Sequence, residues 1–218
     1  MQKKTIMIVA AIVAVALLAF AVPRFYAARE SSDVAAPTVS AAPADVTNAP
    51  ITGSWSVADG STAGYRLDEV LNGADVTVVG RTEEVSGSAQ VEGQELVAAE
   101  IQVDLASVAT DSERRDNYFR TQAIDTSVHP SATFVLTQPV TLGESWPQQV
   151  SLTGDMQING VTQQVVLDAE VTQVSGQLQV AGAVPVTWAD FDVQAPDLGF
   201  VSVEDQGSVE FLVVLERA

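Results

Sequence analysis

One run of side chains in the middle of the chain combines groups that can bind polar ligands. It reads Thr110-Asp111-Ser112-Glu113-Arg114-Arg115-Asp116. An arginine beside a carboxylate can hydrogen-bond a polar ligand group, and the same two side chains can tie a helix to its neighbours through a partly buried ion pair. We favour the structural interpretation, a helix ion pair, for Arg115 and Asp116, and we expect no catalytic role for either.

Other chemically active groups are scarce. The chain has no cysteine, which excludes disulfides, thiolate metal sites and acylation of an N-terminal cysteine. His129 is the only histidine and precedes Pro130, which favours a turn; one imidazole does not build a typical zinc site. The sequence has no Gly-x-Ser-x-Gly nucleophile elbow, phosphate-binding glycine loop or dinucleotide fingerprint. We therefore expect no enzymatic activity, no metal and no cofactor.

The acidic balance of the chain limits its partners. The formal net charge is −18, and from Ile51 onward 25 acidic residues face 6 arginines. Such a surface repels phosphate backbones, so we expect no nucleic-acid binding, and it disfavours flat docking of the domain on an anionic leaflet. The acids near the C-terminus lack EF-hand spacing and are predicted to form a solvated rim; they are Asp190, Asp192, Asp197, Glu204 and Asp205.

The N-terminus carries the pattern of a membrane anchor. Lys3 and Lys4 precede an unbroken apolar stretch from Ile6 to Val22. This stretch is short for a spanning helix but exceeds the usual core of a signal peptide. We predict that residues 1–27 form a single-pass transmembrane helix in the cell membrane, with the lysines in the cytoplasm and the domain on the extracytoplasmic side. Cleavage after Ala19-Phe20-Ala21 would instead give a secreted protein.

The next segment has the composition of a linker. Residues 28–50 are rich in Ala, Pro, Thr and Ser and show no periodicity. Such a segment buries too little apolar surface to fold alone. We expect an extended linker that distances the domain from the bilayer.

From Ile51 the pattern is that of β-strands. Apolar and polar residues alternate, most clearly over 152–171, where Asn159-Gly160 is the preferred type I′ turn pair. Roughly eight or nine strands fit into this region, ending with a strand over 208–215. A Ser/Thr-x-x-Glu capping box at Thr110 predicts one short helix from about Asp111 to Thr121. The pattern indicates an all-β domain over residues 51–218, either a barrel or a sandwich.

The order of three motifs resembles the YceI-like family. They run over 104–116, over 129–134 (His-Pro-Ser-Ala-Thr-Phe) and over 154–162 (Gly-Asp-Met-Gln-Ile-Asn-Gly-Val-Thr). The resemblance implies an extended lipocalin-like antiparallel β-barrel with one short helix over one end, here preceded by the transmembrane helix. Two features depart from the family pattern. His129 stands where tyrosine is frequent, and Gly60–Arg66 replaces a common histidine-serine pair.

The resemblance also implies a function. Members of the YceI-like family bind polyisoprenoid lipids. We therefore expect this protein to bind, sequester or transport a long-chain apolar lipid, of polyisoprenoid or isoprenoid quinone type, in the cell envelope. Aromatic residues expected to line the site are Phe119, Phe134, Trp188 and Phe191. An eight-stranded barrel can hold one ligand or be filled by its own side chains. The alternative is therefore a non-catalytic envelope interaction or stress-protection module with a filled barrel. A homodimer is compatible with either.

Overall fold

The structure is a computed structural model that describes residues 22, 31–39, 49–197 and 199–218. The predicted transmembrane segment of residues 1–27 lies outside the described residues, except for Val22. Among the described residues, no helix combines the length and the apolar character needed to cross a bilayer.

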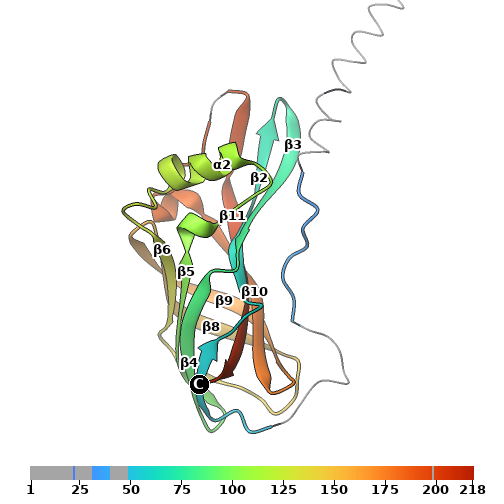
Figure 1. Cartoon of the computed structure of the whole chain (residues 1–218), viewed down its shortest axis with the longest axis vertical. Helices are drawn as coiled ribbons and strands as arrows, with labels where there is room; N and C mark the ends of the chain where they lie inside the picture. The colour runs from blue at the N-terminus through green and yellow to red at the C-terminus, as the bar shows by residue number, and fades with distance from the viewer. Residues whose placement is uncertain (1–21, 23–30, 40–48, 198) are drawn as a thin grey trace, which may run out of the picture.

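The described chain from residue 49 onward forms one antiparallel sheet that closes into a barrel (Figure 1). Its strands are β1 (Gly53–Val57), β2 (Thr62–Leu71), β3 (Ala74–Thr82), β4 (Val85–Glu92), β5 (Glu95–Asp104), β6 (Ser131–Leu136), β7 (Val140–Thr141), β8 (Gln148–Ile158), β9 (Val161–Val174), β10 (Gln177–Thr187) and β11 (Val201–Arg217). The predicted all-β barrel is confirmed.

Eight strands make the closed ring, because β1 pairs with both β4 and β11. The long strand β11 changes partner along its length. Its last residues, Leu215 to Arg217, pair with β1, whereas Val201 to Leu212 pair with β2. The β2–β3 hairpin thus extends the wall upward, and Arg81 on β3 exchanges backbone hydrogen bonds with Ala109, just before the helical segment.

The best-predicted element is the β8–β9 hairpin. Asn159 and Gly160 both have positive φ, 52° and 77°, as a type I′ turn requires. The pairing continues without a shift from Ile158 opposite Val161 to Gln148 opposite Val171. Alternate side chains of β8, including Met156, are buried, so the alternation sets which face looks inward.

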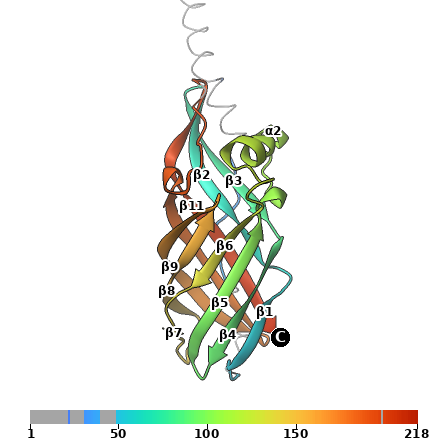
Figure 2. The same ribbon diagram turned by 90° about the vertical axis from the view of Figure 1, so that its left-hand side faces the viewer.

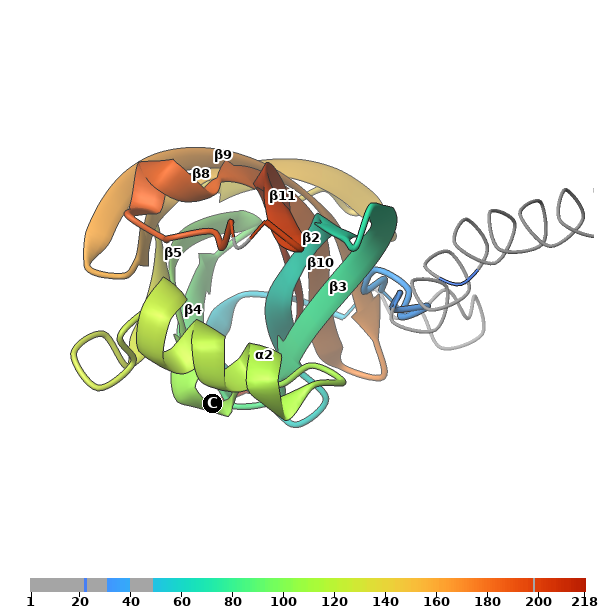
Figure 3. The same ribbon diagram turned by 90° about the horizontal axis from the view of Figure 1, so that it is seen from above.

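The helical segments lie at one end of the barrel. They are η1 (Leu105–Ser107), α2 (Glu113–Tyr118), η2 (Phe119–Ala123, a π-helix) and η3 (Trp188–Phe191). Seen from above, α2 extends across the barrel end (Figure 3). The predicted helix starts two residues later than expected, with Ser112 at the N-cap and no side-chain cap. The capping box does not form, because Asp116 accepts hydrogen bonds from both the backbone N–H and the hydroxyl of Thr110.

The two ends of the barrel differ, and we name them the α2 end and the β1 end (Figure 2). The α2 end comprises α2, η2, η3 and the β2–β3 turn at Asn72-Gly73. At the β1 end, the fully buried Trp55 donates from its indole Nε1 to the carbonyl of Ile51 at 2.9 Å. The Arg217 guanidinium lies 4.9 Å from the centroid of the Trp55 ring. This ring is part of the hydrophobic core at the β1 end.

Residues 31–39, which we call the strap, run along the outside of the barrel beside β3 (Figure 1). The backbone N–H of Ser32 donates to the carbonyl of Thr77 at 2.8 Å. Farther along, Val39 is buried. Within the segment expected to be a linker, this described part therefore contacts the domain.

Candidate binding cavity

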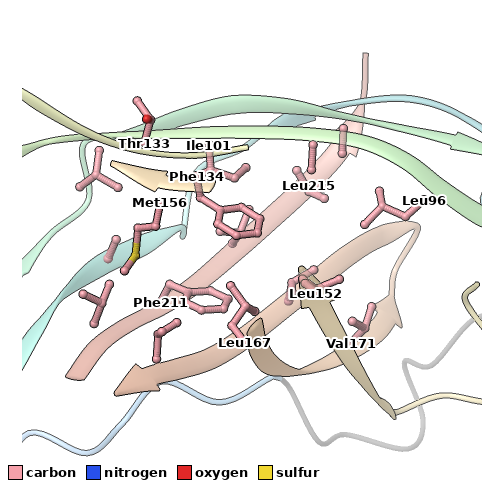
Figure 4. A pocket seen from close by; sticks show the side chains of 18 of the residues that line it. Leu96, Ile101, Thr133, Phe134, Leu152, Met156, Leu167, Val171, Phe211 and Leu215 are labelled. Atoms are coloured by element: carbon pink, nitrogen blue, oxygen red, sulfur yellow. The ribbon is translucent and has the colours of Figure 1, made fainter. Parts of the chain in front are cut away.

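The barrel interior holds a cavity of about 140 Å³. Apart from Thr133, every residue that lines it is apolar (Figure 4). They are Ala63, Ala89, Val91, Leu96, Ala99, Ile101, Val103, Ala132, Phe134, Leu142, Leu152, Met156, Ile158, Leu167, Val171, Leu178, Val180, Val184, Val209, Phe211, Val213 and Leu215. We call this space the lower chamber. Its walls offer an apolar ligand contact but no charged group.

Two phenylalanines project into the lower chamber from different walls, Phe134 from β6 and Phe211 from β11 (Figure 4). The ring of Phe134 passes directly over Gly154 on the neighbouring strand β8. A Cβ at position 154 would collide with that ring. Because Gly154 has no side chain, the ring of Phe134 can lie close to the backbone of β8, and this contact holds the ring in place.

A second cavity of about 150 Å³, the upper chamber, lies beneath α2 and η2. It adjoins the lower chamber, because five residues line both; we call these the waist: Ala63, Val103, Ala132, Ile158 and Val209. Two of the five, Ala63 and Ala132, are alanines, which have small side chains. The two adjoining chambers, which together we call the tube, are largely apolar and lie between the α2 end and the middle of the barrel.

Aromatic rings form part of the upper chamber. Tyr65 stacks on Phe119 with a centroid distance of 5.4 Å and meets Trp188 edge to face at 6.5 Å. Burial raises the pKa of the Tyr65 phenol above its usual value of 10.0, so the group stays neutral in the physiological range. In the described part of the chain, the buried indole Nε1–H of Trp188 has no hydrogen-bond partner. A buried donor of this kind gains from an acceptor that a ligand brings.

An ion-pair network forms the polar rim of the upper chamber. Arg115 Nη2 lies 3.4 Å from Oε1 of Glu69 on β2, and Arg115 Nη1 lies 2.6 Å from Oδ1 of Asp111. Glu69 is only 6% exposed, so its contact with Arg115 ties α2 to the barrel wall. We expected Arg115 and Asp116 to form one ion pair, but the structure gives them different partners. Asp116 binds Thr110 and fixes the loop that precedes α2.

The structure places the four predicted lining residues in different positions. Phe134 lines the lower chamber, and Phe119 and Trp188 line the upper chamber. Phe191 is buried in the core but lines neither chamber. Sequence reasoning missed Tyr65 and Glu69, and also the inward face of β11. The alternation of apolar residues along β11 could have revealed this inward face, because residues 209, 211, 213 and 215 all line the lower chamber.

The surroundings of His129 indicate a structural role. His129 packs against Gly160 in the β8–β9 turn, where a Cβ would come within 2.6 Å of the imidazole Cε1. In the described ranges, no three histidine or acidic side chains are grouped so that they could hold a metal ion.

Comparison with known families and structures agrees with this architecture. A model of the YceI-like domain matches residues 55–215. A search of curated proteins gives no significant match. Among solved structures, the fold is similar to a polyisoprenoid binding domain from Saccharophagus degradans implicated in plant cell wall breakdown. That match has a TM-score of 0.62 at 16% identity and covers 75% of this chain and 98% of the other.

Two further structures are similar. BcnA of Burkholderia cenocepacia matches with a TM-score of 0.58 at 19% identity, over 78% of this chain and 99% of that protein. A YCEI protein of Campylobacter jejuni matches with a TM-score of 0.54 at 19% identity, over 64% of this chain and 85% of that protein. At these identities the likeness establishes a shared fold.

Proposed function

Because the chain belongs to the YceI-like domain family, we propose that it binds a long-chain apolar lipid of polyisoprenoid type inside its barrel. The observation that carries this proposal is the pair of adjoining apolar chambers. A tail that leaves water for such a space gains about 25 cal/mol for each Å² of apolar surface that is buried. The similar domain from Saccharophagus degradans, described as polyisoprenoid binding, supports the same ligand class.

The polar groups of the upper chamber favour one kind of head group. Tyr65, Arg115 and Trp188 supply hydrogen-bond donors there. The guanidinium of Arg115 is already neutralised by Glu69 and Asp111, so a multiply charged anion would meet two carboxylates. An uncharged head group with carbonyl acceptors, such as that of an isoprenoid quinone, suits this arrangement.

The role is passive carriage in the cell envelope rather than catalysis. The lipid would stay bound or leave according to its affinity for the chambers, compared with its affinity for its other environments. Residues 1–27 would anchor the chain in the cell membrane, with the barrel on the extracytoplasmic side, for the reasons of length and charge given for the sequence. A protein partner for a filled barrel is the weaker candidate, since the interior retains cavities.

A substitution at the waist tests the function. Ala132→Phe would place a phenyl group between the two chambers, so a tail that spans both should no longer fit. Val135→Phe adds the same ring to the same strand at an exposed position and serves as the matched control. Native mass spectrometry of each full chain, purified from membranes of its own host, should show bound lipid in the wild type and in Val135→Phe.

Loss of lipid from Ala132→Phe, with a thermal unfolding midpoint close to that of the control, would support the proposal. Lipid-free wild-type protein, stable and folded, would refute it. So would unchanged lipid binding in a folded Ala132→Phe variant, because a tail that avoids the waist cannot occupy the tube.

A further inference from the structure

We propose that the α2 end of the barrel, rather than the β1 end, faces the bilayer and has the lipid surface as its partner. This inference rests on the membrane anchor proposed above. It depends on the strap, which determines at which end the preceding chain leaves the barrel.

The strap begins level with α2. Ser31 Oγ accepts from the backbone N–H of Thr77 at 3.3 Å, and Ser32 N–H donates to the carbonyl of Thr77 at 2.8 Å. Thr77 pairs across β2–β3 with Asp68, which is adjacent to Glu69, the partner of Arg115 on α2. The described segment therefore begins, at Ser31, beside the α2 end.

Specific contacts hold the middle of the strap. Arg66 and Arg81 donate to the backbone carbonyls of Val34 at 2.6 Å and Ala35 at 3.1 Å. Both arginines also bind the carboxylate of Glu210, which is only 3% exposed on the outer face of β11. The strap thus adds two hydrogen bonds to a partly buried charge cluster, an arrangement that favours one fixed path for the chain.

Farther along, the chain reaches the opposite end. The carbonyl of Ala49 accepts from Gln173 Nε2 at 3.2 Å, and the carbonyl of Pro50 accepts from Arg217 Nη2. Gln173 and Arg217 both lie where β9 and β11 reach the β1 end. If the strap were detached, residues 49 and 50 would be the first attached to the barrel. The proposed membrane anchor would then be tethered to the β1 end instead of the α2 end.

Chain length then sets the distance to the membrane. Only the eight residues from Pro23 to Glu30 separate the apolar stretch from the strap. Fully extended, they span at most ~29 Å, whereas a free segment from residue 23 to residue 50 would reach up to ~100 Å. The α2 end is therefore held within ~29 Å of the bilayer, at the end where the upper chamber lies.

The surface of the α2 end fits a lipid partner. Phe200 is 49% exposed, and its carbonyl accepts from the N–H of Asn72 in the β2–β3 turn at this end. Val128, in the loop between η2 and β6, is 63% exposed. Because large apolar side chains gain from contact with lipid, these two positions suit the approach of a tail between bilayer and chamber.

The absence of cysteine from the sequence permits a clean distance measurement. One donor fluorophore is attached at Val128→Cys, at the α2 end, and in a separate sample at Glu92→Cys, at the β1 end; both positions are exposed. The full chain is reconstituted in phosphatidylcholine vesicles that contain an acceptor-labelled lipid. We expect clearly higher energy transfer from position 128 than from position 92.

Variants of the strap test its part in this orientation. Ser32→Pro with Val39→Asp removes the hydrogen bond to Thr77 and charges a buried position, so the difference between the two donors should be lost. Ser32→Ala with Val34→Asp keeps that backbone N–H and places the new charge on an exposed residue, so the difference should persist.

Each outcome has one meaning. Equal transfer from both ends of the bilayer-bound wild type overturns the orientation, whatever the variants do. A difference that survives in a folded release variant overturns the role of the strap. If alkaline carbonate extracts the wild-type chain from the vesicles, the anchor is wrong and this inference falls with it. Lipid retention, measured separately by mass, then still decides the proposed binding function.

Discussion

The phenol ring of Tyr65 on β2 stacks on the ring of Phe119 on η2, with centroids 5.4 Å apart and planes inclined by 22°. This contact joins the barrel wall to the helical segment over the upper chamber. Aromatic pairs of this geometry contribute about 1 kcal/mol beyond the burial of their area. Both rings line the upper chamber, so a movement of the helical segment that separates them would also change access to this chamber.

Removal of one ring should loosen this end of the barrel. We expect Phe119→Ala to lower the free energy of unfolding by about 2 kcal/mol, since the ring is only partly buried, and to speed the release of a bound apolar dye. Chemical denaturation and stopped-flow dye release measure the two effects. Val166→Ala shortens an exposed side chain on β9 that lines neither chamber and should change neither; equal effects from both variants would contradict the role of the stack.

The ion pair of Arg115 with Glu69 should hold α2 on the wall. Arg115→Met leaves Glu69 buried without its cation, so we expect a loss of about 2 kcal/mol and faster amide hydrogen exchange over 109–123. The neighbouring Arg114 is exposed, which makes Arg114→Met the matched control. Unchanged exchange in Arg115→Met would show that other contacts hold the helix.

Alkaline titration should detect the buried phenol. Burial raises the pKa of Tyr65 above 10.0, so the stability that its neutral form provides is complete below pH 10 and is lost as the pH rises through the higher value. We expect tyrosinate absorbance from Tyr65 to develop later than that of an ordinary phenol. The wild type should also lose stability more steeply above pH 10 than Tyr65→Phe. Parallel stability curves for the two proteins would rule out the raised pKa.

The carboxylate under the strap should be important for stability. Glu210→Gln leaves Arg66 and Arg81 without their anion in a partly buried position, and we expect a loss of roughly 3 kcal/mol. Glu216→Gln, at an exposed position on the same strand, should change the unfolding midpoint little. Thermal unfolding of the two variants compares them directly, and a stable Glu210→Gln protein would show that the cluster is dispensable.

Local sequence rules were sufficient where local interactions decide the structure. The β8–β9 hairpin follows from alternation and from Asn159-Gly160, because both the turn type and the inward face depend on neighbouring residues. The start of α2 was predicted too early because Asp116 binds Thr110 and removes it from the cap. A capping motif does not reveal that a residue six positions away competes for the same hydroxyl.

The cavity and the strap depend on contacts that no local pattern encodes. Whether Ala63 and Ala132 leave a space depends on which side chains face them across the barrel. For the strap, two arginines bind backbone carbonyls, which every residue has, so composition gives no signal. Phe191 shows the same limit: an aromatic residue in a barrel is buried, but only packing decides whether it faces the chambers.

The tube carries its polar groups at the α2 end, whereas at the β1 end the buried ring of Trp55 belongs to the core. A cavity with polar groups at one end only can select ligands by the length of their apolar tail. For the lipid proposed above, a tail that matches the depth of the two chambers would bring its head group level with Tyr65 and Arg115, whereas a longer tail would push the head group out into water and a shorter one would leave part of the lower chamber empty. We expect the number of isoprene units, rather than head-group chemistry alone, to select the lipid.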